Sequence, residues 1–279
     1  MTHRRRITAL VMASALALSL TGAPQATAFP TPDPGYQFSR VQRNGSTPVA
    51  LTCKAHPVLV NTNGHDPNLL SQAQRAITDT AAATGLNLFY AGPTSQSWAS
   101  PSPPIRRLKR APIWISFENH SSFPAWTSPW TVGIAQSSIM TINNRRGPKG
   151  IVWFKVIIDA DAYATKKAEE GQAEADRFAY TVLIHELAHG VGLDHTESPT
   201  QIMYPTNVPE ISTFGSGDRV GLSILGRSAC QVGKATALKK HKKPHKKRKS
   251  KRKTRPAQRR ELLPIGASAP GVVTWQIHQ

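Results

Sequence analysis

The sequence has few of the features that define several common protein classes. Only two cysteines, Cys53 and Cys230, occur among its 279 residues. Beyond the N-terminal 28 residues, no stretch is long and apolar enough to cross a bilayer. No internal repeat is present. These absences exclude a repeat protein and a mature chain that spans a membrane with a helix.

The N-terminus has the pattern of an export signal, residues 1–28. A basic start, Arg4–Arg6, precedes a mostly apolar run, Ile7–Leu20. Ala26–Ala28 then supplies the small-x-small pattern of a signal-peptidase site. The other interpretation, a membrane anchor, is disfavoured because the apolar run is too short to span a bilayer. We expect export with cleavage near Ala28. The arginines also fit a twin-arginine signal, so the export route stays open.

The two cysteines are expected to pair. An exported protein meets an oxidising environment, where a Cys53–Cys230 disulfide is favoured over two free thiols. This disulfide would close a loop of nearly the whole folded domain and restrict the unfolded chain strongly. Two alternatives remain: two unrelated buried thiols, or a latent form in which Cys53 masks the metal site inferred below.

Positive charge is concentrated near the C-terminus. Lys239–Arg260 holds 14 Lys or Arg and no acidic residue. Subtracting these charges and the three N-terminal arginines from the net +19 leaves +2 for the rest. The basic character therefore belongs to a tail and not to the folded body. This tail either retains the protein on anionic cell-wall polymers, phospholipid or nucleic acid, or is a solvated run with no partner. It has no interleaved aromatic residues, so stacking on single-stranded nucleic acid is not expected.

Four segments follow from these composition changes. Residues 1–28 are the signal, and residues 29–50 are a polar lead, either a short pro-segment or the mature N-terminus. Residues 51–232 are expected to form the folded domain, and residues 233–279 a basic, disordered C-terminal tail.

Within the folded segment, strands are expected to come before most of the helices. The strand at 151–160 is apolar nearly throughout, so we expect it to be central in a sheet. A polar connection at 161–172 follows it. One helix between the first two strands, and later helices after the last strand, indicate an α+β or α/β sandwich. The expected strands are 56–61, 86–92, 112–118, 132–136 and 151–160, and the expected helices are 67–84, 173–190 and 213–226.

The second expected helix contains the motif HExxH at residues 185–189. His185 and His189 are one turn apart on one helical face, so both imidazoles can reach one ion. Gly192 can take a backbone conformation that lets the chain turn back, and this places His195 as a third nitrogen ligand. Three imidazoles and an open fourth position are typical of a catalytic zinc site. The alternative is a helix with ordinary surface histidines.

Glu186 is next to a ligand and on the same side of the helix. It can take a proton from a zinc-bound water, whose pKa the metal lowers, and pass the proton to the leaving amine. Asp194 either orients a neighbour through a hydrogen bond or is an ordinary turn residue, and we favour the turn.

The run HELAHGVGLDH from His185 to His195 resembles HExxHxxGxxH, the zinc signature of the metzincins. Eight residues later, Met203-Tyr204-Pro205 resembles their Met-turn and is most similar to the matrixin branch. That resemblance implies that Met203 lies beneath the histidines as a hydrophobic base. Without it, Met203 is an ordinary core methionine.

The resemblance also implies an α+β, metzincin-like catalytic domain. This domain has a twisted, mostly parallel sheet of about five strands, three main helices, and a zinc cleft between upper and lower subdomains. Asp218 and the Leu222 region would belong to the helix that closes the domain.

The chain departs from the family pattern in three places. No zinc-blocking cysteine motif precedes the domain, so latency by that route is not expected. Asn119–Lys149 contains one histidine, His120, and no aspartate, so accessory structural zinc and calcium ions are not predicted. Pro205 stands where the astacin type would place a tyrosine ligand.

The leading hypothesis is therefore an enzyme that hydrolyses peptide bonds with one catalytic zinc, and the family implies internal cleavage of a protein or peptide. We expect it to be a monomer, secreted, and extracellular or associated with the cell wall. The alternative is a cell-surface or anionic-polymer binding protein, held by Lys239–Arg260, whose zinc site is not proteolytic.

Overall fold

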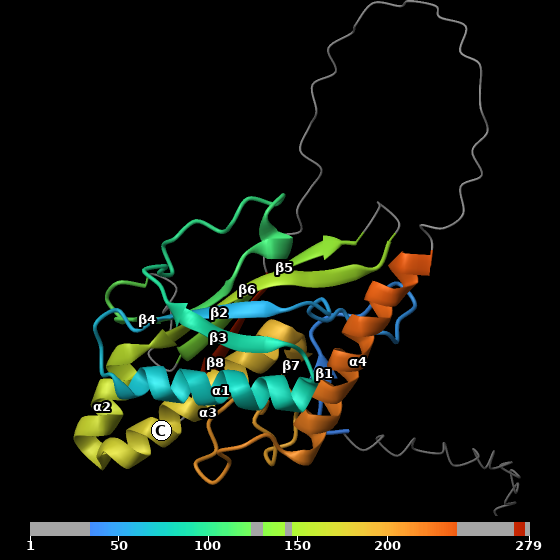
Figure 1. Cartoon of the computed structure of the whole chain (residues 1–279). Helices are drawn as coiled ribbons and strands as arrows, with labels where there is room; N and C mark the ends of the chain where they lie inside the picture. Colours follow the sequence, from blue (N-terminus) through green and yellow to red (C-terminus); the bar gives the residue numbers. More distant parts are fainter. Residues whose placement is uncertain (1–33, 124–130, 143–146, 239–270, 277–279) are drawn as a thin grey trace, which may run out of the picture. The chain divides into compact units, whose positions relative to one another are not determined.

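The computed structural model describes residues 34–123, 131–142, 147–238 and 271–276. Their elements follow one another in the order shown in Figure 1. The helices are α1 (Asn68–Thr84), η1 (Leu108–Arg110), α2 (Ala160–Glu170), α3 (Gln172–Val191) and α4 (Ser216–Leu238). The strands are β1 (Gln37–Phe38), β2 (His56–Asn61), β3 (Leu88–Pro93), β4 (Ile113–Glu118), β5 (Thr131–Thr141), β6 (Lys149–Asp159), β7 (Leu193–Asp194) and β8 (Gly271–Gln276).

One mixed sheet organises these elements, in the order β3-β2-β4-β6-β5-β8. The first four strands in this order, β3, β2, β4 and β6, are parallel to one another, whereas β5 runs antiparallel to β6. β6 is buried from its second residue to its last, because it lies inside the sheet and is covered on both faces. The expected α+β class, with about five mostly parallel strands, is confirmed. β8 adds a sixth strand, antiparallel to β5.

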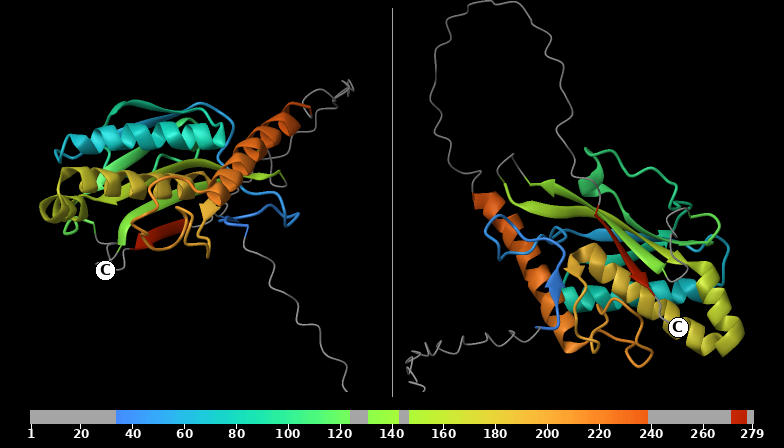
Figure 2. Two further views of the ribbon diagram at one scale, coloured as in Figure 1. Left: turned by 90° about the horizontal axis from the view of Figure 1, so that it is seen from below. Right: turned by 180° about the vertical axis from the view of Figure 1, so that it is seen from behind.

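Helices α1 and α3 cover the same face of the sheet, side by side (Figures 1 and 2). Every residue of α3 from Phe178 onward is buried, which explains why its sequence is apolar on nearly all sides. Gly190 permits this close packing, since a Cβ there would lie 2.5 Å from the Phe154 ring of β6. On the opposite face, Trp98 from the loop after β3 packs against Phe123, Ile134 and Ile157.

Helix α4 packs against α1 where the two cross. Gly226 makes this contact possible, because a Cβ there would lie 1.7 Å from the carbonyl oxygen of Thr84. None of the described helices combines the length and apolar character that a membrane crossing requires.

The connection expected at 161–172 is instead mostly helical, as α2. Asp159 caps this helix, and its side chain accepts hydrogen bonds from the backbone N–H groups of Asp161 and Ala162. Gly171, with φ of +89°, then separates α2 from α3. The connection is polar, as expected, with Ala160 and Tyr163 as the buried residues of α2, but the sequence analysis did not place this helix.

Both ends of the expected domain extend further than the sequence indicated. Val49 is fully buried although it falls in the expected lead, and β1 of the same lead pairs with β7. Helix α4 continues to Leu238, and β8 lies within the segment expected to be a disordered tail. The expected signal, 1–28, and the basic run, 239–260, lie outside the described residues.

Candidate metal centre

The three histidines of the motif meet at one point. The Nε2 atoms of His185 and His189 are 2.9 Å apart, and those of His189 and His195 are 3.2 Å apart. The third pair, His185 and His195, is separated by 3.3 Å. In the part of the chain that the structure describes, these residues are the one group of three that could hold a metal ion. The spacing predicted from sequence is therefore confirmed.

The backbone fixes which ring nitrogen faces this point. Nδ1 of His185 donates to the carbonyl oxygen of Ile202 at 2.7 Å, and Nδ1 of His189 donates to that of Leu193 at 3.0 Å. Since a carbonyl oxygen can only accept, the ring proton lies on Nδ1 and the Nε2 lone pair points to the centre.

Burial keeps these imidazoles neutral. It is the main cause that lowers the pKa of His185 well below its usual value and that of His189 to about 3, and the neighbouring histidines add to both shifts. Burial also lowers the pKa of His195, and the charge of Asp194 opposes that shift. Neutral imidazole is the form that binds metal.

These distances fit a zinc ion. A tetrahedral zinc holds each nitrogen at about 2.0–2.1 Å, which separates two nitrogen ligands by roughly 3.3 Å. The observed separations of 2.9–3.3 Å are close to that value. With the ring protons of His185 and His189 on Nδ1, their Nε2 lone pairs repel each other unless a cation lies between them, so the residues fit the metal that the motif predicts.

Glu186 lies buried between α3 and β5. A Cβ on Gly133 would come within 2.7 Å of the Cγ and Oε1 atoms of Glu186 and within 2.8 Å of Val182. Neither carboxylate oxygen makes a well-formed hydrogen bond to the described residues. Burial raises the pKa of Glu186 well above its usual value, and the backbone amide of Ala135 opposes the shift. This carboxyl group therefore holds a proton more tightly than an exposed glutamate does.

The turn that delivers His195 depends on Gly192. This residue ends α3 with φ of +128°, and a Cβ there would lie 2.9 Å from the carbonyl oxygen of Val49. The next residues, β7, pair with β1. Asp194 accepts a hydrogen bond from the backbone N–H of His195 at 2.9 Å. Asp194 therefore lies in strand β7 and not in a turn, and its side chain contacts the neighbouring ligand residue, which is the alternative that the sequence analysis disfavoured.

A four-residue turn forms at the expected place after His195. The backbone N–H of Tyr204 donates to the carbonyl oxygen of Gln201 at 3.2 Å, and Met203 inside the turn is fully buried. The Met203 carbonyl accepts from the N–H of Thr196, the residue after the third histidine. The turn is thus tied directly to the metal-binding segment.

Asp218 of α4 fixes the turn around Met203 through hydrogen bonds to its backbone, a role that the sequence analysis missed. Its carboxylate accepts from the backbone N–H groups of Ile202 at 2.7 Å, Met203 at 3.3 Å and Gly215 at 2.8 Å. Gln201 returns a contact by accepting from the Asp218 N–H at 3.0 Å. Burial raises the pKa of Asp218, and the three donated hydrogen bonds oppose that shift. A lone acid in the first turn of a helix was the only signal in the sequence.

A pocket of about 360 Å³ opens beside His195. Its lining includes Tyr204 and Pro205, which follow Met203, and Gln37 of β1. Thr196 and Glu197 complete its lining. The only acidic side chain in this lining is Glu197.

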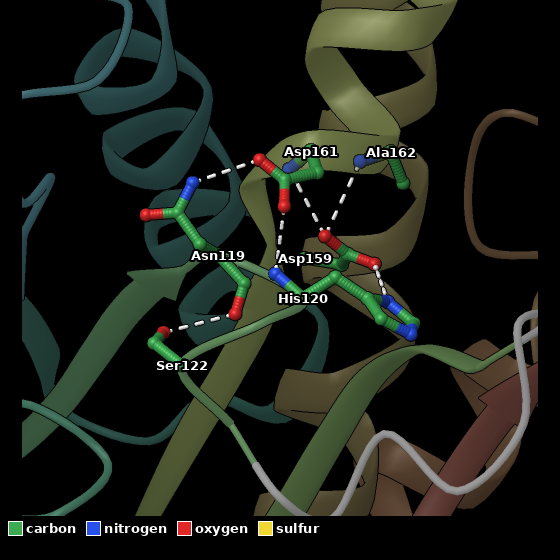
Figure 3. Close-up of polar contacts among 6 residues, drawn as sticks. All are labelled: Asn119, His120, Ser122, Asp159, Asp161 and Ala162. Atoms are coloured by element: carbon green, nitrogen blue, oxygen red, sulfur yellow. Dashed lines mark hydrogen bonds and ion pairs between the residues drawn. The ribbon is translucent and has the colours of Figure 1, made fainter.

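His120 lies apart from the triad, in the loop after β4 (Figure 3). Its Nδ1 atom is 3.1 Å from Oδ2 of Asp159, and its backbone N–H donates to Asp161 at 2.8 Å. Asn119 adds a hydrogen bond to the other Asp161 oxygen at 2.8 Å. Two aspartates at the start of α2 therefore anchor the beginning of the loop that leads toward β5.

Comparison with known families agrees with this geometry. Residues 113–221 match the model of the family described as Matrixin. The chain carries a matrixin domain. The matched part of the chain runs from β4 into α4 and includes all three histidines, so the centre is the zinc-binding triad of a metalloendopeptidase family. No curated protein matches the chain.

Proposed function

We propose that this matrixin is a secreted endopeptidase in which Glu186 activates the attacking water. The proposal is carried by one observation: the buried Glu186 shares helix α3 with His185 and His189, whose imidazoles converge with that of His195. Burial raises the pKa of this carboxyl group, so its affinity for a proton is higher than that of an exposed glutamate.

The Nε2 atoms of His185, His189 and His195 would hold the ion. Zinc bound there would lower the pKa of a water molecule, polarise the scissile carbonyl and favour the ionised form of Glu186. Glu186 takes a proton from the water as it attacks the carbonyl carbon. It then gives that proton to the amine that leaves when the C–N bond breaks. Met203 supports the histidines as the core of the turn beneath them.

The test is Glu186→Gln, which keeps the shape of the side chain and removes its ability to accept a proton. We expect casein or gelatin cleavage to fall by about 10²- to 10⁴-fold, the usual contribution of a general base. Zinc content, measured by elemental analysis, should stay at one ion per chain. Cleavage at the wild-type rate in Glu186→Gln, or a wild-type protein that binds no zinc, would contradict the proposal.

Secretion is proposed on the signal pattern of residues 1–28. Expression of the full chain in a bacterial host should yield an extracellular protein whose new N-terminus lies near position 29. Replacing the Arg4–Arg6 cluster by glutamine should retain the protein inside the cell. Uncleaved protein in the medium would argue against the signal.

We also propose the Cys53–Cys230 disulfide. The described residues include no free cysteine, and the chain has one other cysteine with which Cys53 can pair. The intact protein should be 2 Da lighter than its reduced form by mass spectrometry, since forming the bond removes two hydrogen atoms. Two alkylatable thiols in unreduced, unfolded protein would exclude the pairing.

The basic run Lys239–Arg260 is proposed to hold the secreted monomer on anionic polymers. Its 14 positive charges carry the proposal. Deleting residues 239–260 should abolish retention on anionic beads at low salt, and high salt should release the full chain. Retention that depends on neither salt nor this run would rule the idea out. Light scattering should give the mass of one chain.

A further inference from the structure

The edge of β5 next to Glu186 is occupied by the chain's own C-terminal strand. β8 pairs antiparallel with β5, in a register that sets Trp275 opposite Gly133 and Val273 opposite Ala135. Gly133 and Ala135 are also the residues of β5 that approach the Glu186 carboxylate. β8 contacts α3 as well, and Figure 2 shows it in dark red along the outer side of β5. The strand therefore lies against both elements that carry the site.

An extended peptide is the natural occupant of such an edge. An edge strand offers a row of unpaired N–H and C=O groups, and an added strand satisfies them through backbone hydrogen bonds that are independent of side-chain identity. A peptide cleaved with the help of Glu186 must pass beside Gly133 and Ala135. Substrate and β8 would need the same backbone groups of β5, so both cannot pair with this edge at once.

The sequence of β8 is suited to this pairing. Its residues, GVVTWQ, are rich in β-branched and aromatic types and include no charge or proline. It is also tethered, because residues 239–270 connect it to the end of α4. A connection of 32 residues reaches at most about 110 Å. An occupant on the same chain competes at an effective concentration that can reach roughly millimolar.

We propose that residues 271–276 are an autoinhibitory segment that competes with peptide substrates for the edge of β5. This rests on the proposed function, since it assumes that substrates bind beside Glu186. Removal of the segment frees the edge, and the free segment rebinds from solution.

The first experiment compares the full zinc-loaded chain with one that ends at Pro270. We expect kcat/KM for a fluorogenic peptide to rise about five-fold or more on truncation, chiefly through a lower KM, because a tethered competitor is lost. A synthetic peptide of residues 268–279 should then inhibit the truncated chain competitively. Equal kcat/KM in both chains together with no inhibition by the peptide would overturn the proposal.

Proline substitutions at two neighbouring positions of β8, Val273 and Thr274, test the proposal if truncation impairs folding. Successive N–H groups of a strand point in opposite directions, so only one of Val273 and Thr274 donates to β5. Proline removes the donor and is tolerated on an edge strand where the N–H faces outward. One of Val273→Pro and Thr274→Pro should therefore activate the enzyme and the other should not. Two variants with the wild-type KM would count against an inhibitory strand.

A binding measurement separates this inference from the proposed function. The truncated chain carrying Glu186→Gln is loaded with zinc and titrated with a fluorescein-labelled peptide of residues 268–279, followed by anisotropy. Saturable binding, absent in the full-length Glu186→Gln chain, supports the inference even if no form hydrolyses peptides. If the wild type hydrolyses peptides and the labelled peptide fails to bind, the inference alone is wrong.

Discussion

At the scale of single residues, the absence of a side chain at Gly133 decides where the Glu186 carboxylate lies. Gly133→Ala should displace that carboxylate, because the new Cβ would be 2.7 Å from its Oε1 atom. A shift of about 1 Å at a reacting group can cost roughly 100-fold in rate. We expect kcat to fall by about that factor, with zinc content unchanged.

Gly150→Ala is the matched control for this substitution. It adds the same methyl group to the same sheet, but its Cβ would meet the flexible end of Ile142 at 2.6 Å, far along β6 from Glu186. The control should keep the wild-type kcat. Similar losses in both variants would mean that Gly133 matters for packing and not for the carboxylate.

The buried histidines predict an acid-sensitive metal-free protein. The pKa of His189 is about 3 when folded, against about 6.5 when unfolded. Between these pH values the unfolded chain binds a proton that the folded chain does not. The contribution of His189 to the free energy of unfolding is therefore complete above about pH 6.5 and is lost as the pH drops. The slope is about 1.4 kcal/mol per pH unit for one such histidine.

Urea titrations of chelated protein between pH 4 and 7 would measure this slope. His189→Gln should make it shallower by about 1.4 kcal/mol per pH unit, the contribution of one group. A parallel downward shift with the same slope would show that His189 does not titrate with unfolding. Substitution of His65, which is far from the triad in sequence and only half-buried, is a suitable control.

The residues found from the sequence are those whose relation is local. His185, Glu186 and His189 share one helix, and His195 follows a single turn, so spacing alone placed them. Gly133 and Asp218 act across long sequence separations, on Glu186 and on the turn at Met203. A pattern within one segment does not carry such contacts, although an isolated glycine in a strand is a signal for a close approach.

At the scale of elements, the first turn of α4 orients the metal ligand His185 indirectly, through the backbone of Ile202. Asp218 binds the N–H of Ile202, and the carbonyl of Ile202 accepts from Nδ1 of His185. Asp218→Ala should leave the buried N–H groups of Ile202 and Met203 unsatisfied, each at a cost of about 1–3 kcal/mol, and remove the acceptor of the partly buried Gly215 N–H. Zinc affinity should weaken by roughly 10- to 100-fold, as is usual when the support of a ligand is removed.

Competition with a chromogenic chelator would measure that affinity. Val220→Ala, two residues along the same helix and 49% exposed, should bind zinc as the wild type does. A variant of Asp218 that unfolds more easily but binds zinc normally would limit the role of this residue to stability.

The elements missed by the sequence analysis were missed for physical reasons. The strand β6 and the helix α3 have strong apolar patterns and were placed within two residues of their observed bounds. Helix α2 has few buried residues, Ala160 and Tyr163, so no apolar face marked it. β8 is six residues long, and its partner β5 is more than 130 positions away. Long-range pairing of so short a strand leaves little trace in local periodicity.

At the scale of the whole molecule, metal binding and folding should be coupled. The triad joins α3 to the segment after Gly192, so zinc binds the folded chain far better than the unfolded one. At a thousand-fold excess over the dissociation constant, this adds about 4 kcal/mol to the free energy of unfolding. Chelation with EDTA should lower the Tm by roughly 10 °C.

Calorimetry with and without EDTA would test this coupling, and readdition of zinc should restore the Tm. The variant His195→Ala, which lacks one ligand, should show a much smaller EDTA effect. A Tm that is the same with and without metal in the wild type would mean that the site is fully formed without its ion.

The segment before the first long strand limits where the protein can be processed. The backbone N–H and Oγ of Ser39 both donate to the carbonyl of Gly192, at 3.0 and 3.1 Å. Gly35 lies so close to α4 that a Cβ on Gly217 would meet its carbonyl oxygen at 2.2 Å. Trimming beyond Gly35 would uncover the glycine turn that delivers the third ligand. A maturation protease must therefore stop upstream of this point, and N-terminal sequencing of the active enzyme should find the cut before residue 35.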